Sequence, residues 1–564
     1  MTALRPAGLG PIIGHTTDTT CRVWAQAPGH GAPGTRESDR RTVGVIGIVS
    51  KDRKRVKPAY YFRLPREFDR TGSFVLGEHV ALGRCEKDID KPDEAIPLEP
   101  DTDYIVRVGT LAVDDPMPDD ETLTDLELAK RLPPIQNVAP MLLELPADLS
   151  EARVQTFPDR AQPPLDQLDF LLGSCRYPGL LWKIKEADRI FAPMLAHLKD
   201  GPNGPPARFS LMVGDQIYAD MLNRHIAVGR ADTYDEFQER YQTALGSPNM
   251  RALLRAAPSY MILDDHEIED NWTHDRESSR HALFQIAIGA YMSYQWSHSA
   301  RSFGRLFYYH FECGGYPFFV LDTRTQRVTK DVRDSLEDNH MLGRPTIDPG
   351  HPGQLGQFLD WLGAQQDQRG DVPKFVVSSS VFAPNPMSER IAEGGETAYR
   401  LYKANPKHRD DSDSWPAYPK TRLAILERIS QKRIQNVVFL TGDVHCSNIA
   451  KLTIPAAGGG PLTAYDVTSS AFYWPFPFAD GDPNGFVHDS SDPEQLDSFP
   501  IAAGDVDYRA FAFTQEDNFA RLSVDKAKRE IAVRYFTREG AAIEVRDANR
   551  WPTEKLVLPL APWT

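Results

Sequence analysis

The sequence predicts two domains, a β-sandwich over residues 1–150 and a layered α/β domain over residues 168–564, joined by a linker over residues 151–167. Short apolar segments separated by turns predict the sandwich. After Leu168, apolar runs of strand length alternate with segments of helical periodicity, which is typical of a layered domain with mostly parallel strands at its centre. Four of these runs end in polar clusters, where α/β folds bind their ligands.

The N-terminal 150 residues contain short segments in which apolar and polar residues alternate. In 97–111, a Pro-Asp turn precedes Tyr104, Val106 and Val108, which would lie on one face of a strand. We expect the other strands of this domain at 20–25, 42–48, 60–64 and 74–76.

The larger domain is predicted to contain both strands and helices, from apolar runs of strand length and from helical periodicity. Its expected strands are 168–172, 209–213, 260–263 and 436–440. Helical spacing is clearest in 353–368, and the other expected helices are 185–198, 282–297 and 421–433. A hairpin at 306–321 and antiparallel strands near 511–514, 519–524, 530–537 and 541–546 complete the domain. The long irregular segments 383–418 and 471–505 are interpreted as lids.

Composition narrows the classes of function. The chain has 564 residues and a formal net charge of −15. That acidity argues against a nucleic-acid-binding surface and against electrostatic docking on anionic membranes. It leaves phosphate chemistry open, because a bound metal can supply positive charge locally. The five scattered cysteines do not form the pattern of a disulfide scaffold.

Targeting signals and membrane spans are not evident in the sequence. The first 15 residues lack a charged segment followed by an apolar one, and no run of about 18 apolar residues is present. We therefore expect a cytoplasmic protein, with export left open if a leader has been trimmed.

The four polar clusters carry the chemistry. They are Gly173-Ser174-Cys175-Arg176, Gly214-Asp215-Gln216-Ile217-Tyr218-Ala219-Asp220, Asp264-Asp265-His266-Glu267 and Gly442-Asp443-Val444-His445. Adjacent carboxylates repel each other unless a cation or a proton offsets their charge. Carboxylates, an imidazole, a thiol and a phenol at four strand ends therefore predict a site for several metal ions. Two other readings stay open, namely a serine hydrolase that uses Ser174, although no G-x-S-x-G motif surrounds it, and scattered solvated carboxylates.

The order of these clusters resembles that of the calcineurin-like metallophosphoesterases, and more closely that of the alkaline phosphatase D (PhoD-like) family. The motifs that carry the resemblance are GSC, GDQIYAD, DDHEIEDNW, DTRTQR and GDVHCS, which span about 168–450. The segments GPIIGHTTDTTCRVWAQA and EPDTDYIVRV are also similar to the N-terminal sandwich of that family. The resemblance implies a metallophosphoesterase-type sandwich of β-sheets flanked by helices.

The resemblance also implies a set of metal ligands. One metal would be bound by Cys175, Asp215, Tyr218 and His445, a donor set that suits Fe3+. Asp215 would bridge to a second metal bound by Asp265 and Asp443. Many relatives have Asn and His at the positions of Asp265 and Asp443 and a further His, which is missing from 376–382. The second site would then hold only oxygen ligands, so Ca2+ is favoured, with Mg2+, Mn2+ and Zn2+ as alternatives.

The implied reaction is the hydrolysis of phosphate esters, in which two cations hold a hydroxide and the phosphoryl oxygens. His266 would protonate the leaving group, and Arg176 and Arg324 are candidate phosphate-binding residues. Asp220 and Asp264 would orient the ligands. The substrate would be a small-molecule or lipid phosphate ester, with monoesters and diesters unresolved. The alternative is a non-catalytic binding protein on the same scaffold.

Overall fold

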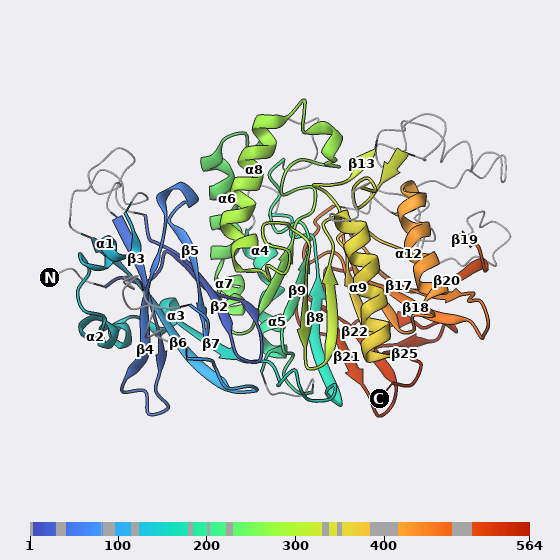
Figure 1. The fold of residues 1–564 in the computed structure, drawn as a ribbon, viewed down its shortest axis with the longest axis horizontal. Coiled ribbons are helices and arrows are strands. Elements are labelled where there is room, and N and C mark those ends of the chain that lie inside the picture. The colour runs from blue at the N-terminus through green and yellow to red at the C-terminus, as the bar shows by residue number, and fades with distance from the viewer. Residues whose placement is uncertain are drawn as a thin grey trace.

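The computed structural model describes residues 4–29, 41–79, 82, 96–113, 123–178, 184–199, 204–220, 229–329, 338–346, 352–383, 415–476 and 499–563. Within these residues the chain forms an N-terminal β-sandwich and a larger domain of two facing sheets covered by helices (Figure 1). Most of the two segments interpreted as lids, 384–414 and 477–498, lies outside the described residues.

The N-terminal domain is a sandwich of two antiparallel sheets. The first contains β1 (Leu9–Thr16), β2 (Cys21–Gln26) and β5 (Thr71–Leu76) in that order. The second contains β4 (Val56–Arg63), β3 (Arg41–Val49), β6 (Asp103–Val113) and β7 (Glu151–Gln155). Apolar side chains of both sheets, such as Val23 and Val106, share one core, as expected when alternate residues face inward.

The expected start of the linker is wrong. Residues 151–155 form β7, which pairs with β6 from Asp103↔Gln155 to Arg107↔Glu151. The side chains of Ala152 and Val154 are buried in the sandwich, so this segment completes the N-terminal sheet. Short helices precede it, α1 (Asp125–Ala129), α2 (Ile135–Val138) and α3 (Ala147–Ser150).

The larger domain has two mixed sheets. The six-stranded sheet has the order β10 (Ser259–Ile262), β9 (Ser210–Val213), β8 (Gln167–Gly173), β21 (Asn518–Asp525), β22 (Glu530–Thr537), β25 (Leu556–Pro559). The eight-stranded sheet has the order β11 (Tyr309–Cys313), β12 (Tyr316–Val320), β15 (Lys374–Val377), β16 (Val437–Thr441), β18 (Leu462–Thr468), β17 (Ser447–Ile454), β20 (Gly504–Thr514), β19 (Phe499–Ile501). In each sheet, parallel strands adjoin antiparallel ones.

Both faces of each sheet are buried, which explains the continuous apolar runs. On β8, Phe170 and Leu172 face the second sheet, whereas Leu171 faces the helices. Phe170 stacks on Phe209, which directly precedes β9, and meets Phe375 of the facing sheet edge to face, with ring centroids 5.2 and 5.3 Å apart. This aromatic packing joins the two sheets.

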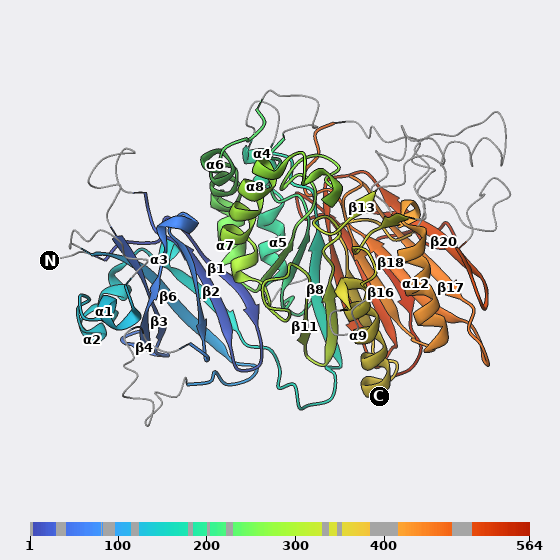
Figure 2. The ribbon, with the colours of Figure 1, turned by 45° about the horizontal axis from the view of Figure 1, so that its top comes forward.

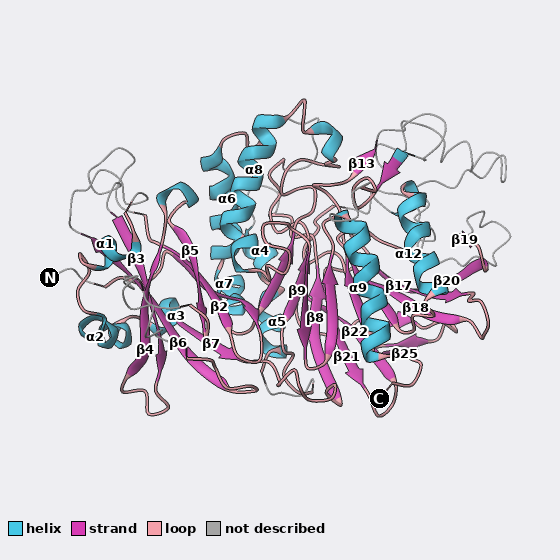
Figure 3. Cartoon of the chain, viewed as in Figure 1, coloured by secondary structure: helices cyan, strands magenta, loops and turns pink. Residues whose placement is uncertain are grey.

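Helices cover the outer faces of both sheets (Figure 3). One face carries α4 (Ile184–Asp188), α5 (Phe191–His197), α6 (Tyr234–Gly246), α7 (Pro248–Leu254) and α8 (His281–Tyr294). The other carries α9 (Gly353–Arg369) and α12 (Pro419–Gln431). The single helix expected at 185–198 is two helices, because Pro193 cannot continue a helix through Arg189, four residues before it. The predicted layered arrangement of β-sheets flanked by helices is otherwise confirmed.

The sandwich packs directly against the helices of the larger domain, as Figures 1 and 2 show. Trp24 of β2 donates its indole N–H to the carbonyl of Ser293 in α8 at 2.8 Å. The guanidinium of Arg251 in α7 donates to the carbonyl of Gly10 at 2.9 Å. Among the described helices, none is both long and apolar enough to cross a membrane.

Candidate metal centre

The four polar clusters converge at one place. β8, β9 and β10 are parallel neighbours, so the three clusters that follow them lie at the same edge of the sheet. The fourth cluster follows β16 of the facing sheet. Gly442 allows this approach, because a Cβ at that position would overlap the side chain of Ser174.

The backbone at the strand ends turns sharply. Cys175, Asp215, Asp443 and His445 have positive φ angles of 56°, 54°, 74° and 53°. This left-handed conformation is uncommon for residues other than glycine and is often found at functional sites. It directs these side chains toward a common centre, which no periodicity in the sequence would predict.

One group of side chains combines four kinds of donor atom. Ligand atoms of Cys175, Asp215 and His445 lie within 4.8 Å of one another. The Tyr218 hydroxyl lies 3.2 Å from Asp215 Oδ2 and 3.2 Å from His445 Nε2. All four residues predicted for the first metal are therefore together.

A second group contains only oxygen donors. Ligand atoms of Asp215, Asp264, Asp265 and Asp443 also lie within 4.8 Å of one another, so Asp215 belongs to both groups. Asp264 was expected only to orient ligands, but its carboxylate is close enough to be a candidate ligand. A third combination joins Asp215 and Asp265 to His266.

The acidic group contains carboxylate oxygens that are available to bind cations. Asp215 Oδ1, Asp264 Oδ2 and Asp265 Oδ1 are buried and accept no hydrogen bond from the described part of the chain. Such atoms are rare in folded proteins because their desolvation is costly. Burial raises the pKa of Asp215, Cys175 and Tyr218, and neighbouring carboxylates add to this effect. Bound cations would reverse it, since they favour the deprotonated ligands.

The pKa values of the two histidines of the site are shifted in opposite directions. Burial lowers the pKa of His445 to about 3, so its imidazole is neutral, as a metal ligand must be. Burial also opposes the charge on His266, but Asp220, Asp265 and Asp215 outweigh it and raise its pKa. His266 Nδ1 lies 2.6 Å from Asp220 Oδ1, and the other oxygen of Asp220 accepts from the Asp270 N–H at 2.5 Å.

Arg324 lies inside the acidic group and is fully buried. Its guanidinium donates to Asp264 Oδ1 and lies 3.2 Å from Asp443 Oδ2 and 3.4 Å from Asp265 Oδ1. It is therefore a counter-ion of these carboxylates. Burial opposes ionisation of Asp265, but Arg324 and His266 lower its pKa.

Arg176, the other residue predicted to bind phosphate, contacts helices in this structure. Its guanidinium donates to the Ala244 carbonyl and, at 2.7 Å, to Ser247 Oγ, and Asp188 is 3.8 Å away. These contacts hold it against α6 and the start of α7, in a buried position over the ring of Phe191. The contacts of Arg176 thus join helices to the sheet, and its role in phosphate binding stays a prediction.

The contacts of Ser174 do not support the serine-hydrolase reading. Ser174 is fully buried, and its hydroxyl donates to the Ser469 carbonyl at 3.1 Å and accepts from the Asp443 N–H at 3.3 Å. Within the described residues, no basic side chain is hydrogen-bonded to Ser174. The residue instead joins the turns that carry Cys175 and Asp443.

No role was predicted for Glu267, but in the structure its side chain holds two of the turns in place. Its carboxylate accepts from the N–H groups of Asp215 (3.1 Å), Gln216 (2.7 Å) and Asp264 (2.9 Å) and from the Gln295 amide (3.1 Å). Burial raises its pKa to about 7. Its place in the DDHE cluster was the available signal, but its partners depend on the tertiary fold.

We expect Glu267→Gln to weaken metal binding about 10–100-fold, the usual cost of losing a group that orients ligands. The amide can present an NH2 group to backbone N–H donors, so unfolding should also become easier by about 1–3 kcal/mol. Metal titration and urea denaturation measure both effects. Glu269→Gln is the matched control, because the equally buried Glu269 pairs with Arg276 and Arg280 instead. Equal metal affinity in both variants and the parent protein would contradict this role.

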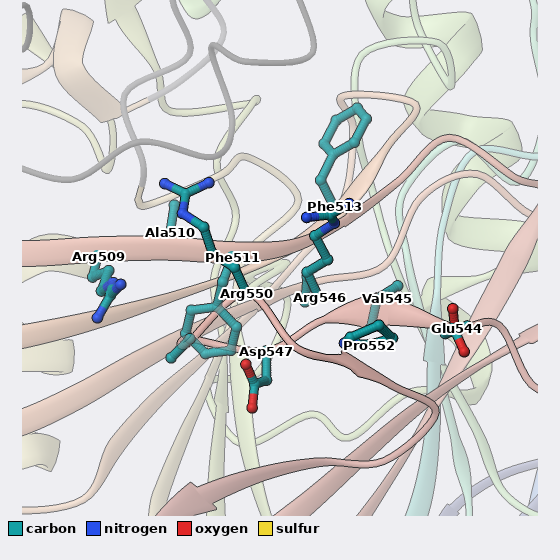
Figure 4. Close-up of a pocket in the computed structure, with 12 residues that line it drawn as sticks. Arg509, Ala510, Phe511, Phe513, Glu544, Val545, Arg546, Asp547, Arg550 and Pro552 are labelled. Atoms are coloured by element: carbon teal, nitrogen blue, oxygen red, sulfur yellow. The ribbon is translucent and has the colours of Figure 1, made fainter.

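A surface cavity of about 460 Å3 lies elsewhere, over β20 and the hairpin of β23 (Val545–Arg546) and β24 (Pro552–Thr553) (Figure 4). Its lining includes Arg509, Phe511 and Arg550. None of its lining residues belongs to the four clusters.

Known phosphatases are similar to this chain in sequence. The family model described as PhoD-like phosphatase matches residues 195–476, which include every predicted site residue except Cys175 and Arg176. Alkaline phosphatase D of Bacillus subtilis (strain 168) is 27% identical over 267 residues, which are 43% of this chain and 42% of that protein. The chain thus matches less than half of the length of this curated relative.

The chain is also similar to solved structures. The alignment with a structure of PhoD covers 99% of this chain and 93% of that chain, with a TM-score of 0.60 and 17% identity. A purple acid phosphatase, PPD1 from yellow lupin (Lupinus luteus) seeds, aligns with 99% of this chain and 74% of its own, with a TM-score of 0.49 and 10% identity. The first of these similarities supports the two-domain architecture described above.

Proposed function

The chain belongs to the PhoD-like phosphatase family, and from this premise we propose that it hydrolyses phosphate esters in a metal-dependent reaction. The observation that carries the proposal is the buried carboxylate of Asp215, which two different donor groups share. A single carboxylate common to two cation sites is the arrangement that a two-metal phosphoester hydrolase needs.

The donor sets favour two different metals. Cys175, Asp215, Tyr218 and His445 would hold the first, and their thiolate, phenolate and imidazole favour Fe3+. Asp215, Asp265 and Asp443 would hold the second, with Asp264 beside them, and oxygen donors alone favour Ca2+ over Mg2+, Mn2+ or Zn2+. When bound, such ions polarise the phosphoryl group and activate water for in-line attack.

The residues around the metals would move the proton and hold the charge. Asp220 occupies Nδ1 of His266, which leaves Nε2 to donate a proton to the departing oxygen of the ester. Arg324 would balance the carboxylates, and Arg324 and Arg176 stay the candidates for contact with the substrate phosphate. The substrate would be a small-molecule or lipid phosphate ester.

A panel of chromogenic phosphate monoesters and diesters, paired with elemental analysis of the purified protein, tests the proposal. We expect bound iron together with a second cation, hydrolysis of at least one ester class, and loss of hydrolysis after chelation that is restored by added metal. Metal-loaded protein that hydrolyses no ester would instead favour a non-catalytic binding protein. Activity of an iron-free sample would refute the Fe3+ assignment but leave the proposed hydrolysis unaffected.

A further inference from the structure

Aromatic rings form one side of the metal centre. We call this group the aromatic rim; its members are Tyr177, Tyr218, Trp474 and Phe476. Ring centroids are 5.2 Å apart for Tyr177 and Tyr218, 5.1 Å for Tyr177 and Phe476, and 5.0 Å for Trp474 and Phe476. These are the separations of packed aromatic pairs, so the rim is one continuous apolar surface.

The rim is attached to the turn that carries the proposed thiolate ligand. The Tyr473 N–H donates to the Cys175 carbonyl at 3.3 Å, and the Tyr177 N–H donates to the Tyr473 carbonyl at 3.1 Å. The Trp474 N–H donates to Asp517 Oδ1 at 2.9 Å. Backbone contacts therefore fix the position of Trp474 relative to the metal ligands.

The rim also adjoins the residue proposed to protonate the leaving group. The ring of Tyr218 lies 4.2 Å from the ring of His266, and Trp474 stacks on His445 at 3.6 Å with an interplanar angle of 11°. Tyr177 and Tyr218 are buried, whereas Trp474 and Phe476 are partly exposed. Metal binding requires no exposed apolar ring, but a substrate that binds beside His266 would cover these two.

We propose that the aromatic rim binds an aromatic ring on the leaving-group side of the substrate, so that the enzyme prefers aryl or heteroaryl phosphate esters. This inference rests on the proposed function. The phosphate would bind at the metal centre, and the ring would lie against Trp474 and Phe476. Stacking on an aromatic side chain contributes on the order of a tenfold gain in affinity.

Two non-hydrolysable ligands isolate the contribution of the ring. Phenylphosphonate and methylphosphonate present the same phosphonate with and without a ring, and calorimetry gives their Kd values on protein purified with its native metals. We expect phenylphosphonate to bind about tenfold more tightly than methylphosphonate. In Trp474→Ala the ratio of the methylphosphonate Kd to the phenylphosphonate Kd should fall to below about threefold. Trp474→Phe should keep most of the parent ratio, because phenylalanine still offers an aromatic ring. Because both ligands share the phosphonate, a change in metal content would affect both and leave the ratio intact.

Trp551→Ala is the matched control, because Trp551 is 70% exposed and lies in the turn between β23 and β24, outside the rim. It should leave the ratio unchanged. A ratio near one in the parent protein, or a ratio that Trp474→Ala does not change, would overturn the inference. Hydrolysis of phenyl phosphate and methyl phosphate is measured on the same proteins. A ring preference without any hydrolysis would refute the proposed function and support the rim as a binding surface.

Discussion

Asp215→Asn is expected to release metal from both candidate sites and to lower kcat/KM by at least about a hundredfold. Replacing a residue that only orients metal ligands typically lowers metal affinity or activity about 10–100-fold. Asp215 should matter more, because it is shared by every group of candidate ligands. The amide keeps the size of the side chain but removes its negative charge, so the loss should come from weaker metal binding. Elemental analysis and kcat/KM on the same sample measure the two effects.

The control for this experiment is Asp169→Asn on β8. Asp169 is also buried, but it pairs with Arg521 at 2.8 Å, away from the four clusters. It should lower the free energy of unfolding without changing the metal content per folded molecule. Asp215→Asn protein that keeps both metals and full activity would refute the shared-ligand assignment.

His266→Gln is expected to have the second largest effect, and the size of that effect should depend on the leaving group. Loss of a general acid typically lowers the rate about 10²–10⁴-fold. Phenyl phosphate needs this proton, whereas 4-nitrophenyl phosphate has a leaving group that departs readily as an anion. We therefore expect a large loss of kcat for the phenyl ester and a much smaller loss for the nitrophenyl ester. Both esters carry a ring, so the aromatic rim affects them alike.

Metal content separates the two roles that the geometry allows for His266. Its imidazole lies near Asp220, which suits an acid, but also within ligand distance of Asp215 and Asp265. As an acid, the residue can be replaced without loss of metal. Equal losses for both esters together with a lost metal would show that His266 is a ligand instead. Asp220→Asn should reproduce the leaving-group dependence in weaker form, because it keeps the imidazole but removes the carboxylate that orients it and raises its pKa.

The sequence was sufficient for the four strands that precede the polar clusters and for the residues at their ends. Both depend on short spacings, such as the apolar run that ends at Gly173 and the pair Asp443 and His445 that follows β16. Fully buried strands are the easiest to recognise, because both of their faces require apolar residues. The predicted ligands Cys175 and Asp215 are brought together for the same reason, as they follow adjacent parallel strands.

The contacts of residues whose partners are distant in the chain could not be predicted. Arg176 follows Cys175 directly, yet the direction of its side chain depends on where α6 ends, about 70 residues later. Glu267 contacts backbone groups of another turn, and Arg324 reaches the acidic group from the loop after β12. The strand at 151–155 was also missed, since charged residues alternate with the buried Ala152 and Val154.

The left-handed backbone at four of the proposed ligands has an evolutionary consequence. Glycine adopts this conformation without the steric cost of about 1–2 kcal/mol that other residues incur. Laboratory evolution that selects only for folded, heat-resistant protein should therefore favour glycine at Cys175, Asp215, Asp443 and His445, and each such gain would remove a ligand. These positions should be kept fixed when the protein is engineered for thermostability, because the sequence that folds best is not the sequence that binds metal.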